Sequence, residues 1–72
     1  MYETVLDCKG LKSPLSMVKI SRAIKKMDTG NQLVVEATDS VFKIILEAWI
    51  NKMNHRLLAF ESGNIQRAII QK

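Results

Sequence analysis

The spacing of apolar residues changes repeatedly along this chain, and these changes constrain its fold more than any other feature. In residues 14–27 and 41–53, apolar side chains recur every three or four positions, as they do on one side of a helix. Shorter runs rich in β-branched and apolar residues are typical of strands. We expect four of these strands, at residues 2–7, 32–38, 56–61 and 65–71. The predicted order of elements is therefore β-α-β-α-β-β.

This order favours an α/β two-layer sandwich in a single domain, residues 1–72. A strand, a helix and a strand in succession favour a right-handed crossover between parallel strands. The last two strands are separated by Ser62-Gly63-Asn64, which suits a tight hairpin and adds antiparallel pairing. Both helices are apolar on one side only. We therefore expect them to cover one face of a four-stranded mixed sheet.

Local signals indicate where the two helices begin and end. Ser13 is expected to cap the first helix, with Pro14 at its first position, where the missing N–H costs nothing. Asp39 offers a cap for the second helix, and Asn54 offers a left-handed residue after it. Gly10, in the preceding loop, is free to take a positive φ. The expected buried stripes are Met17, Ile20, Ile24 and Met27 in the first helix, and Phe42, Ile45, Leu46, Trp49 and Met53 in the second.

Positive charge is concentrated near the first helix. The net charge is +4, and residues 9–26 contain six basic residues and no acidic one. This pattern fits either a solvated helix face or a surface for an acidic partner, which could be a protein or RNA. No aromatic residue lies among these cations and no RNA-binding motif is present. The predicted partner-binding residues are Lys9, Lys12, Lys19, Arg22 and Lys26.

Cysteine and histidine are too few for most metal or disulfide chemistry. Cys8 is the only cysteine and His55 the only histidine, so we expect no internal disulfide, no metal site and no cofactor. No apolar run approaches the length needed to span a bilayer, and the N-terminus has no basic segment typical of a signal peptide. A cytoplasmic protein without membrane insertion is the expectation.

The segment that begins at Leu6 matches the motif L-D-x-x-G-L-x-C-P-x-P at Leu6, Asp7, Gly10, Leu11 and Pro14. This motif belongs to the TusA/SirA/YedF family of small sulfur-carrier proteins, which the chain resembles over nearly its whole length. Later family features are matched by Ala37-Thr38-Asp39, Trp49, Asn54-His55-Arg56-Leu57 and Ile69-Ile70-Gln71-Lys72. The resemblance implies the same β-α-β-α-β-β sandwich, similar to the C-terminal domain of a bacterial translation initiation factor.

The departure from the family lies at its reactive residue. The motif cysteine is replaced by Ser13 and the second motif proline by Ser16. In the family, that cysteine holds sulfur as a persulfide, which it receives from a donor such as a cysteine desulfurase and passes to an acceptor protein. This relay serves thiouridine synthesis on transfer RNA and other sulfur metabolism. A helix N-terminus and nearby cations such as Lys9 and Lys12 would stabilise a thiolate, but they cannot ionise a serine at neutral pH.

Three functions therefore remain open for a chain of this kind. Cys8 could carry sulfur in place of the motif cysteine, which requires a reactive and partly exposed thiol. A lone cysteine at the end of a strand can also be a small buried apolar residue. Without a working thiol, the chain would bind partners of the true carriers and transfer no sulfur. The third function is a basic module that contacts RNA weakly.

Overall fold

A computed structural model describes residues 3–72 and confirms the predicted architecture. The predicted start of the first strand at Tyr2 lies outside the described residues. The remaining boundaries agree with the sequence to within two residues. The elements are β1 (Glu3–Cys8), α1 (Leu15–Lys25), β2 (Gln32–Ala37), α2 (Phe42–Met53), β3 (Arg56–Glu61) and β4 (Gln66–Gln71).

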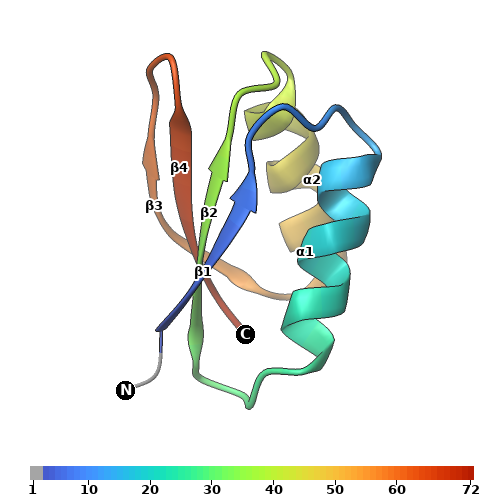
Figure 1. Cartoon of the computed structure of the whole chain (residues 1–72). Coiled ribbons are helices and arrows are strands. Elements are labelled where there is room, and N and C mark those ends of the chain that lie inside the picture. Colours follow the sequence, from blue (N-terminus) through green and yellow to red (C-terminus); the bar gives the residue numbers. More distant parts are fainter. Residues whose placement is uncertain (1–2) are drawn as a thin grey trace.

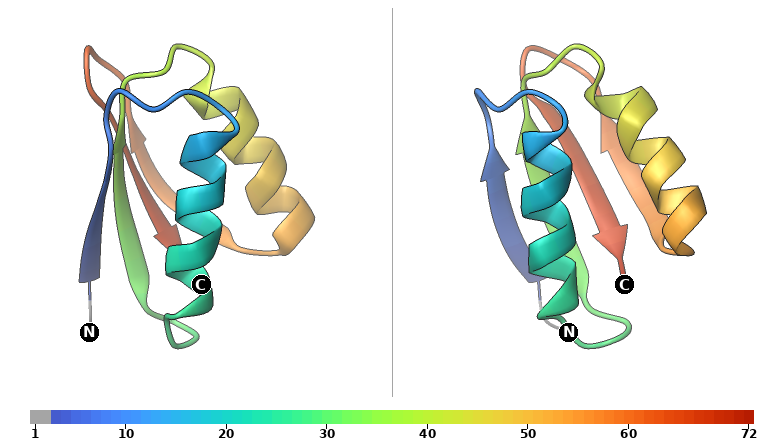
Figure 2. Two further views of the ribbon diagram at one scale, coloured as in Figure 1. Left: turned by 45° about the vertical axis from the view of Figure 1, so that its right-hand side comes forward. Right: turned by 90° about the vertical axis from the view of Figure 1, so that its right-hand side faces the viewer.

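The four strands form one mixed sheet in the order β1-β2-β4-β3, and both helices lie on the same face of it (Figures 1 and 2). β1 pairs with β2 in parallel, whereas β4 is antiparallel to both β2 and β3. The crossover through α1 and the terminal hairpin produce these two kinds of pairing, as the sequence predicts. α1 contacts β1 and β2, and α2 contacts β3.

The core fills the space between the helices and the sheet. β2 is a central strand, and Leu33, Val34 and Val35 are all fully buried. In α1 the predicted stripe is correct, because Met17, Ile20 and Ile24 are buried and Met27 packs against them. The core cluster consists of Cys8, Met17, Ile20, Ile24, Leu33, Val35, Ala37, Phe42, Leu46, Ile50, Ala68 and Ile70.

The stripe of α2 differs from the prediction at its end. Phe42, Leu46 and Ile50 are buried at successive steps of four residues. Ile50 was not in the predicted stripe, and Met53, which was, is 46% exposed. Met53 is the last residue of the helix, so its side chain lies beyond the part of α2 that faces the core. Asn54 then takes the predicted left-handed conformation, with φ 62°.

The C-terminal strand is tied to the turn between α1 and β2. Gly30 has a φ of +94°, which favours glycine, and its N–H donates to the carbonyl of Lys72 over 2.9 Å. The Lys72 N–H donates to Asn31, and its Nζ donates to the carbonyl of Met27. These contacts fix the end of the molecule opposite the loop that carries the family motif.

Candidate functional site

The loop from Lys9 to Pro14 joins β1 to α1 and carries the motif positions. Gly10 has a φ of +80°, in the left-handed region that the sequence predicted for it. Its N–H donates to the side-chain oxygen of Thr38 over 2.9 Å. The N–H of Leu11 donates to the carbonyl of Cys8 over 3.1 Å, and its half-buried side chain packs against the core. The loop is therefore a defined turn held by main-chain groups.

Ser13 does not cap α1, and that prediction is wrong. The helix begins at Leu15, its cap position is Pro14, and no side chain hydrogen-bonds to its first turn. The Ser13 N–H instead donates to Asp39 Oδ2 over 3.0 Å. Ser13 lies one position before the cap position, and Pro14 is the cap residue and not the first residue of the helix as predicted. The Ser13 hydroxyl oxygen is buried and has no hydrogen-bond partner among the described residues.

Thr38 and Asp39, which we call the clamp, connect the motif loop to the start of α2. Asp39 Oδ1 accepts the N–H of Val41 over 3.3 Å, and its carbonyl accepts the N–H of Phe42. Asp39 is nevertheless not the predicted cap, because the cap position of α2 is Val41 and no side chain caps the first turn. Its Oδ2 holds Ser13. The N–H groups of Ser13 and Val41 lower the pKa of Asp39, although partial burial opposes them and Lys12 adds a smaller lowering effect. The clamp carboxylate is thus held in its ionised form.

The clamp predicts an acid-sensitive contribution to stability. Because the folded pKa of Asp39 lies below its ordinary value, its contribution is present above about pH 4 and is lost as the pH falls further. We expect Asp39→Asn to lower the free energy of unfolding at pH 7 and to have a smaller effect at pH 3. Urea unfolding at both pH values measures this difference. An equal effect at the two pH values would contradict the role of the charge, and Asp28→Asn provides a matched control.

Cys8 is the last residue of β1 and lies in the core, paired in register with Ala37 of β2. Its exposed fraction is 0%. Burial raises the pKa of the thiol, Lys19 lowers it and Asp7 raises it, with burial the largest effect. A buried thiol with a raised pKa is a poor nucleophile. The structure therefore places Cys8 as a small apolar core residue, which is the other reading of a lone cysteine at a strand end.

The burial of Cys8 predicts slow chemistry in the folded protein. We expect an aromatic disulfide reagent to label Cys8 at least a hundredfold more slowly in the native chain than in the urea-unfolded chain, because labelling requires local opening. Absorbance of the released thiolate measures both rates. Labelling of the native chain as fast as that of a free peptide thiol would show instead that Cys8 reaches solvent.

The predicted cations make different contacts. Lys9 pairs with Glu36 over 3.5 Å and with Asp7 over 3.9 Å, so its charge is partly neutralised at the edge of the sheet. Lys19 donates to the carbonyl of Asp7 over 2.6 Å. Arg22 instead lines a groove between α1 and α2, together with Lys25, which was not among the predicted binding residues. Only Lys12 contributes to the electrostatics of the clamp.

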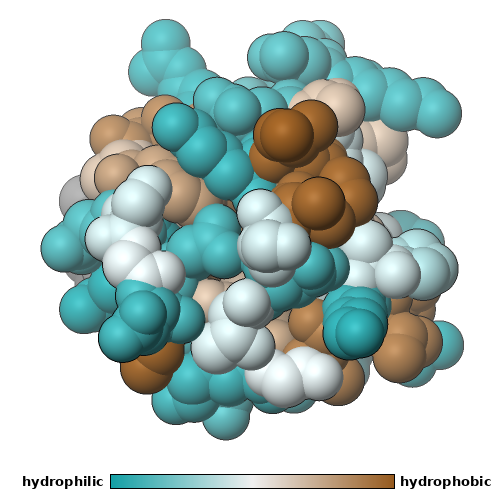
Figure 3. Space-filling model, turned by 90° about the horizontal axis from the view of Figure 1, so that it is seen from above, coloured by the Kyte–Doolittle hydropathy of each residue, from teal (hydrophilic) through white to brown (hydrophobic). Residues whose placement is uncertain are grey.

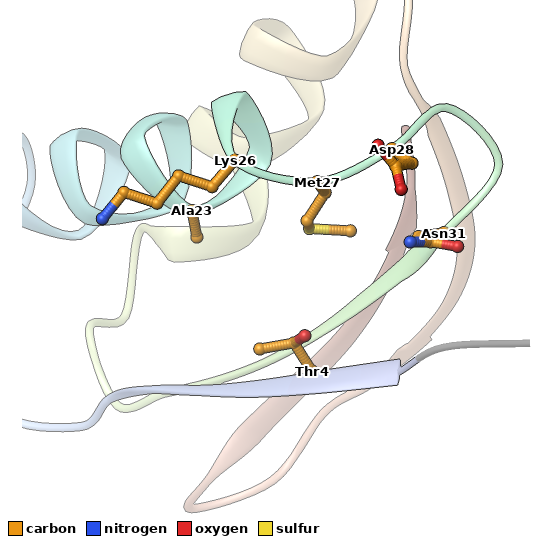
Figure 4. Close-up of a pocket in the computed structure, with 6 residues that line it drawn as sticks. All are labelled: Thr4, Ala23, Lys26, Met27, Asp28 and Asn31. Carbon is orange, nitrogen blue, oxygen red and sulfur yellow. The ribbon is translucent and has the colours of Figure 1, made fainter.

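Lys26 lies one helical turn beyond Arg22, beside a cavity of about 370 Å³ at the C-terminal end of α1. Figure 4 shows this cavity, with Met27 directed between the helix and β1. Its lining residues are Thr4, Ala23, Lys26, Met27, Asp28 and Asn31. The cavity therefore belongs to the end of the molecule opposite the motif loop.

Apolar side chains reach the surface at the motif end. Leu15 is 60% exposed and Ile44 is 71% exposed, and Val18 and Val41 are exposed to a smaller extent. We call these four residues the motif-end surface: Leu15 and Val18 lie in the first turn of α1, Ile44 lies in the first turn of α2, and Val41 immediately precedes α2. Figure 3, which views this end of the molecule, shows hydrophobic side chains among hydrophilic ones. Such a surface beside the clamp is suited to contact with another protein.

Comparisons with known proteins agree with these features. Residues 4–72 match the family described as "Sulfurtransferase TusA". The chain is 38% identical over 71 residues to "Putative sulfur carrier protein YrkI" of Bacillus subtilis, covering 97% of this chain and 95% of that protein. It is also 38% identical over 69 residues to YrkF of the same organism, which bears a name of the same form. That match covers 94% of this chain but only 37% of the length of YrkF.

Within residues 3–72, no helix is long and apolar enough to cross a membrane.

Proposed function

Because this chain belongs to the TusA family, we propose that it works in a sulfur relay as a docking protein that carries no persulfide of its own. One observation carries this proposal. The motif position holds a serine, and the chain's single thiol, on Cys8, is fully buried with a raised pKa. Position 13 therefore lacks the required sulfur, and Cys8 lacks the required exposure.

The surroundings of Ser13 give its hydroxyl no means of reacting. A serine nucleophile needs a base that accepts its proton. Asp39 is the carboxylate bonded to this residue, but its oxygens accept the main-chain N–H groups of Ser13 and Val41. The low pKa of Asp39 also makes it a weak base. Even an activated hydroxyl would form no persulfide, because a persulfide requires a sulfur atom bonded to the side-chain carbon.

The proposed docking surface surrounds Ser13. The clamp holds the motif loop through main-chain groups, and the motif-end surface exposes apolar side chains beside it. Lys12 adds positive charge close to the clamp. We expect these features to contact a cysteine desulfurase or a downstream sulfur acceptor, the two kinds of partner that a carrier meets.

Intact-protein mass spectrometry and a binding assay test the proposal together. After incubation with a cysteine desulfurase and cysteine, the wild-type chain is expected to show no gain of sulfur, while immobilised chain still binds the desulfurase. A carrier known to accept sulfur from that enzyme serves as the positive control. A gain of one sulfur that disappears in Cys8→Ala would overturn the proposal in favour of transfer through Cys8. Absence of binding to both donor and acceptor proteins would overturn the docking role.

A further inference from the structure

A shallow groove of about 360 Å³ lies between α1 and α2, with most of its lining residues on α1. The two helices lie side by side on the same face of the sheet (Figure 2). Met17 and Val18 contribute to the groove from α1, and Trp49 contributes from α2. Met17 is nearly buried, Trp49 is half-buried and Val18 is 44% exposed. The groove therefore offers an apolar floor that solvent can reach.

Two cations border this floor. Arg22 and Lys25 both line the groove, and both lie in the last turn of α1. Among the described side chains, neither has a carboxylate within 4.0 Å, and both recorded ion pairs use Lys9. No residue from Lys9 to Lys26 is acidic, so α1 itself provides no neutralising charge. These cations are available to the carboxylates of another molecule.

We propose that this groove binds an acidic amphipathic helix of a partner protein. Apolar side chains of that helix contact Met17, Val18 and Trp49, and its carboxylates face Arg22 and Lys25. An amphipathic helix provides both kinds of side chain at steps of three and four residues, and recognition of this kind is common between proteins. RNA fits the groove less well, because Trp49 is the one aromatic side chain among the described residues that line it, and Met17 and Val18 give successive bases no further stacking surface.

This inference extends the proposed docking role but is tested without a sulfur-relay protein. The probe is a synthetic helical peptide with leucine on one face and glutamate elsewhere, and without tryptophan. Trp49 is the only tryptophan in the chain, so its fluorescence reports directly on the groove. Amide chemical shifts of the wild-type chain provide a second readout that depends on no variant. Peptides with lysine in place of glutamate, or with the leucines scattered, are the controls.

We expect the acidic peptide to shift Trp49 emission and the amide signals of both groove walls, and the lysine peptide to do neither. The double variant Arg22→Glu/Lys25→Glu should bind the acidic peptide at least tenfold more weakly than the wild-type chain does. The matched pair Lys43→Glu/Arg56→Glu changes the net charge equally at exposed residues that do not line the groove, and it should weaken binding less than threefold. Circular dichroism verifies that both variants fold.

Three results would overturn the proposal. The first is absence of acidic-peptide binding to the folded wild-type chain. The second is an equal loss of affinity in the two double variants, which would indicate a net-charge effect alone. The third is tighter binding of transfer RNA than of the peptide at the same salt concentration, if that binding is lost in the Arg22→Glu/Lys25→Glu variant.

Failure of the groove proposal can be distinguished from failure of the docking role. If the groove binds the peptide but the chain binds no relay protein, the docking role fails and the groove stands. If a desulfurase binds both variants equally and the peptide does not bind, the groove fails and the docking role stands.

Discussion

The Ser13→Cys variant is expected to gain the mass of one sulfur atom on incubation with a cysteine desulfurase and cysteine, whereas the wild-type chain gains none. Ser13 is partly buried, and its hydroxyl oxygen is buried without a hydrogen-bond partner. Transfer to a thiol at this position therefore requires its side chain to rotate toward solvent, and no hydrogen bond opposes that rotation. The thiol would also lie just before the start of α1, where free N–H groups of the first turn and Lys12 favour a thiolate.

Two controls make the result specific to position 13. Ser13→Cys/Cys8→Ala should gain the same mass, because the buried thiol takes no part. Ser16→Cys introduces a cysteine three positions further along, where the side chain is fully buried, and should gain none. Gain of sulfur by the wild-type chain, or its loss on removal of Cys8 from the Ser13→Cys variant, would show that the reactive thiol is Cys8. No gain by Ser13→Cys, despite binding to the desulfurase, would show that more than this one residue has changed in the site.

Phe42→Ala is expected to have the largest effect on stability. Phe42 is fully buried at the start of α2, and its ring lies 6.2 Å from that of Phe60. Truncating a buried phenylalanine typically lowers the free energy of unfolding by about 3–5 kcal/mol, because apolar contacts are lost and a cavity remains. Small domains have total stabilities of about 5–15 kcal/mol, so this change removes a large share.

Urea unfolding followed by circular dichroism measures this effect. We expect the midpoint for Phe42→Ala to fall well below that of the wild-type chain, or the variant to be partly unfolded in buffer. Ile44→Ala is the matched control two residues away, because Ile44 is 71% exposed and its truncation should change stability by less than about 0.5 kcal/mol. Similar midpoints for the two variants would mean that Phe42 is not part of a tightly packed core.

The fold was predictable because local patterns and the tertiary arrangement agree. The stripe of Met17, Ile20 and Ile24 indicates both the helix and the side that it buries. The resemblance to the TusA family is likewise confirmed, over residues 4–72. The error at Met53 has a simple origin, since a periodic pattern in sequence does not show where a helix extends past the sheet.

The site was harder to predict because it depends on contacts between distant parts of the chain. Ser13 followed by proline is a strong local signal for a helix cap. That signal places the start of the helix one residue too early, and the contact that the Ser13 N–H does make is to Asp39, 26 positions away. The Ala37-Thr38-Asp39 segment was noticed as a family feature, but its role in holding the motif loop required the structure. The contacts of each cation also depend on the direction of its side chain, which the sequence does not show. Lys19 bonds to the carbonyl of Asp7, whereas Arg22 lines the groove.

The way the clamp holds the motif loop bears on which residues position 13 can accept. Both clamp contacts to the loop are donated by main-chain N–H groups, those of Gly10 and Ser13. Any residue except proline provides the same donor at position 13. Exchange of cysteine and serine at this position therefore leaves both contacts to the loop in place. The side chain at position 13 and the shape of the loop can change independently of one another.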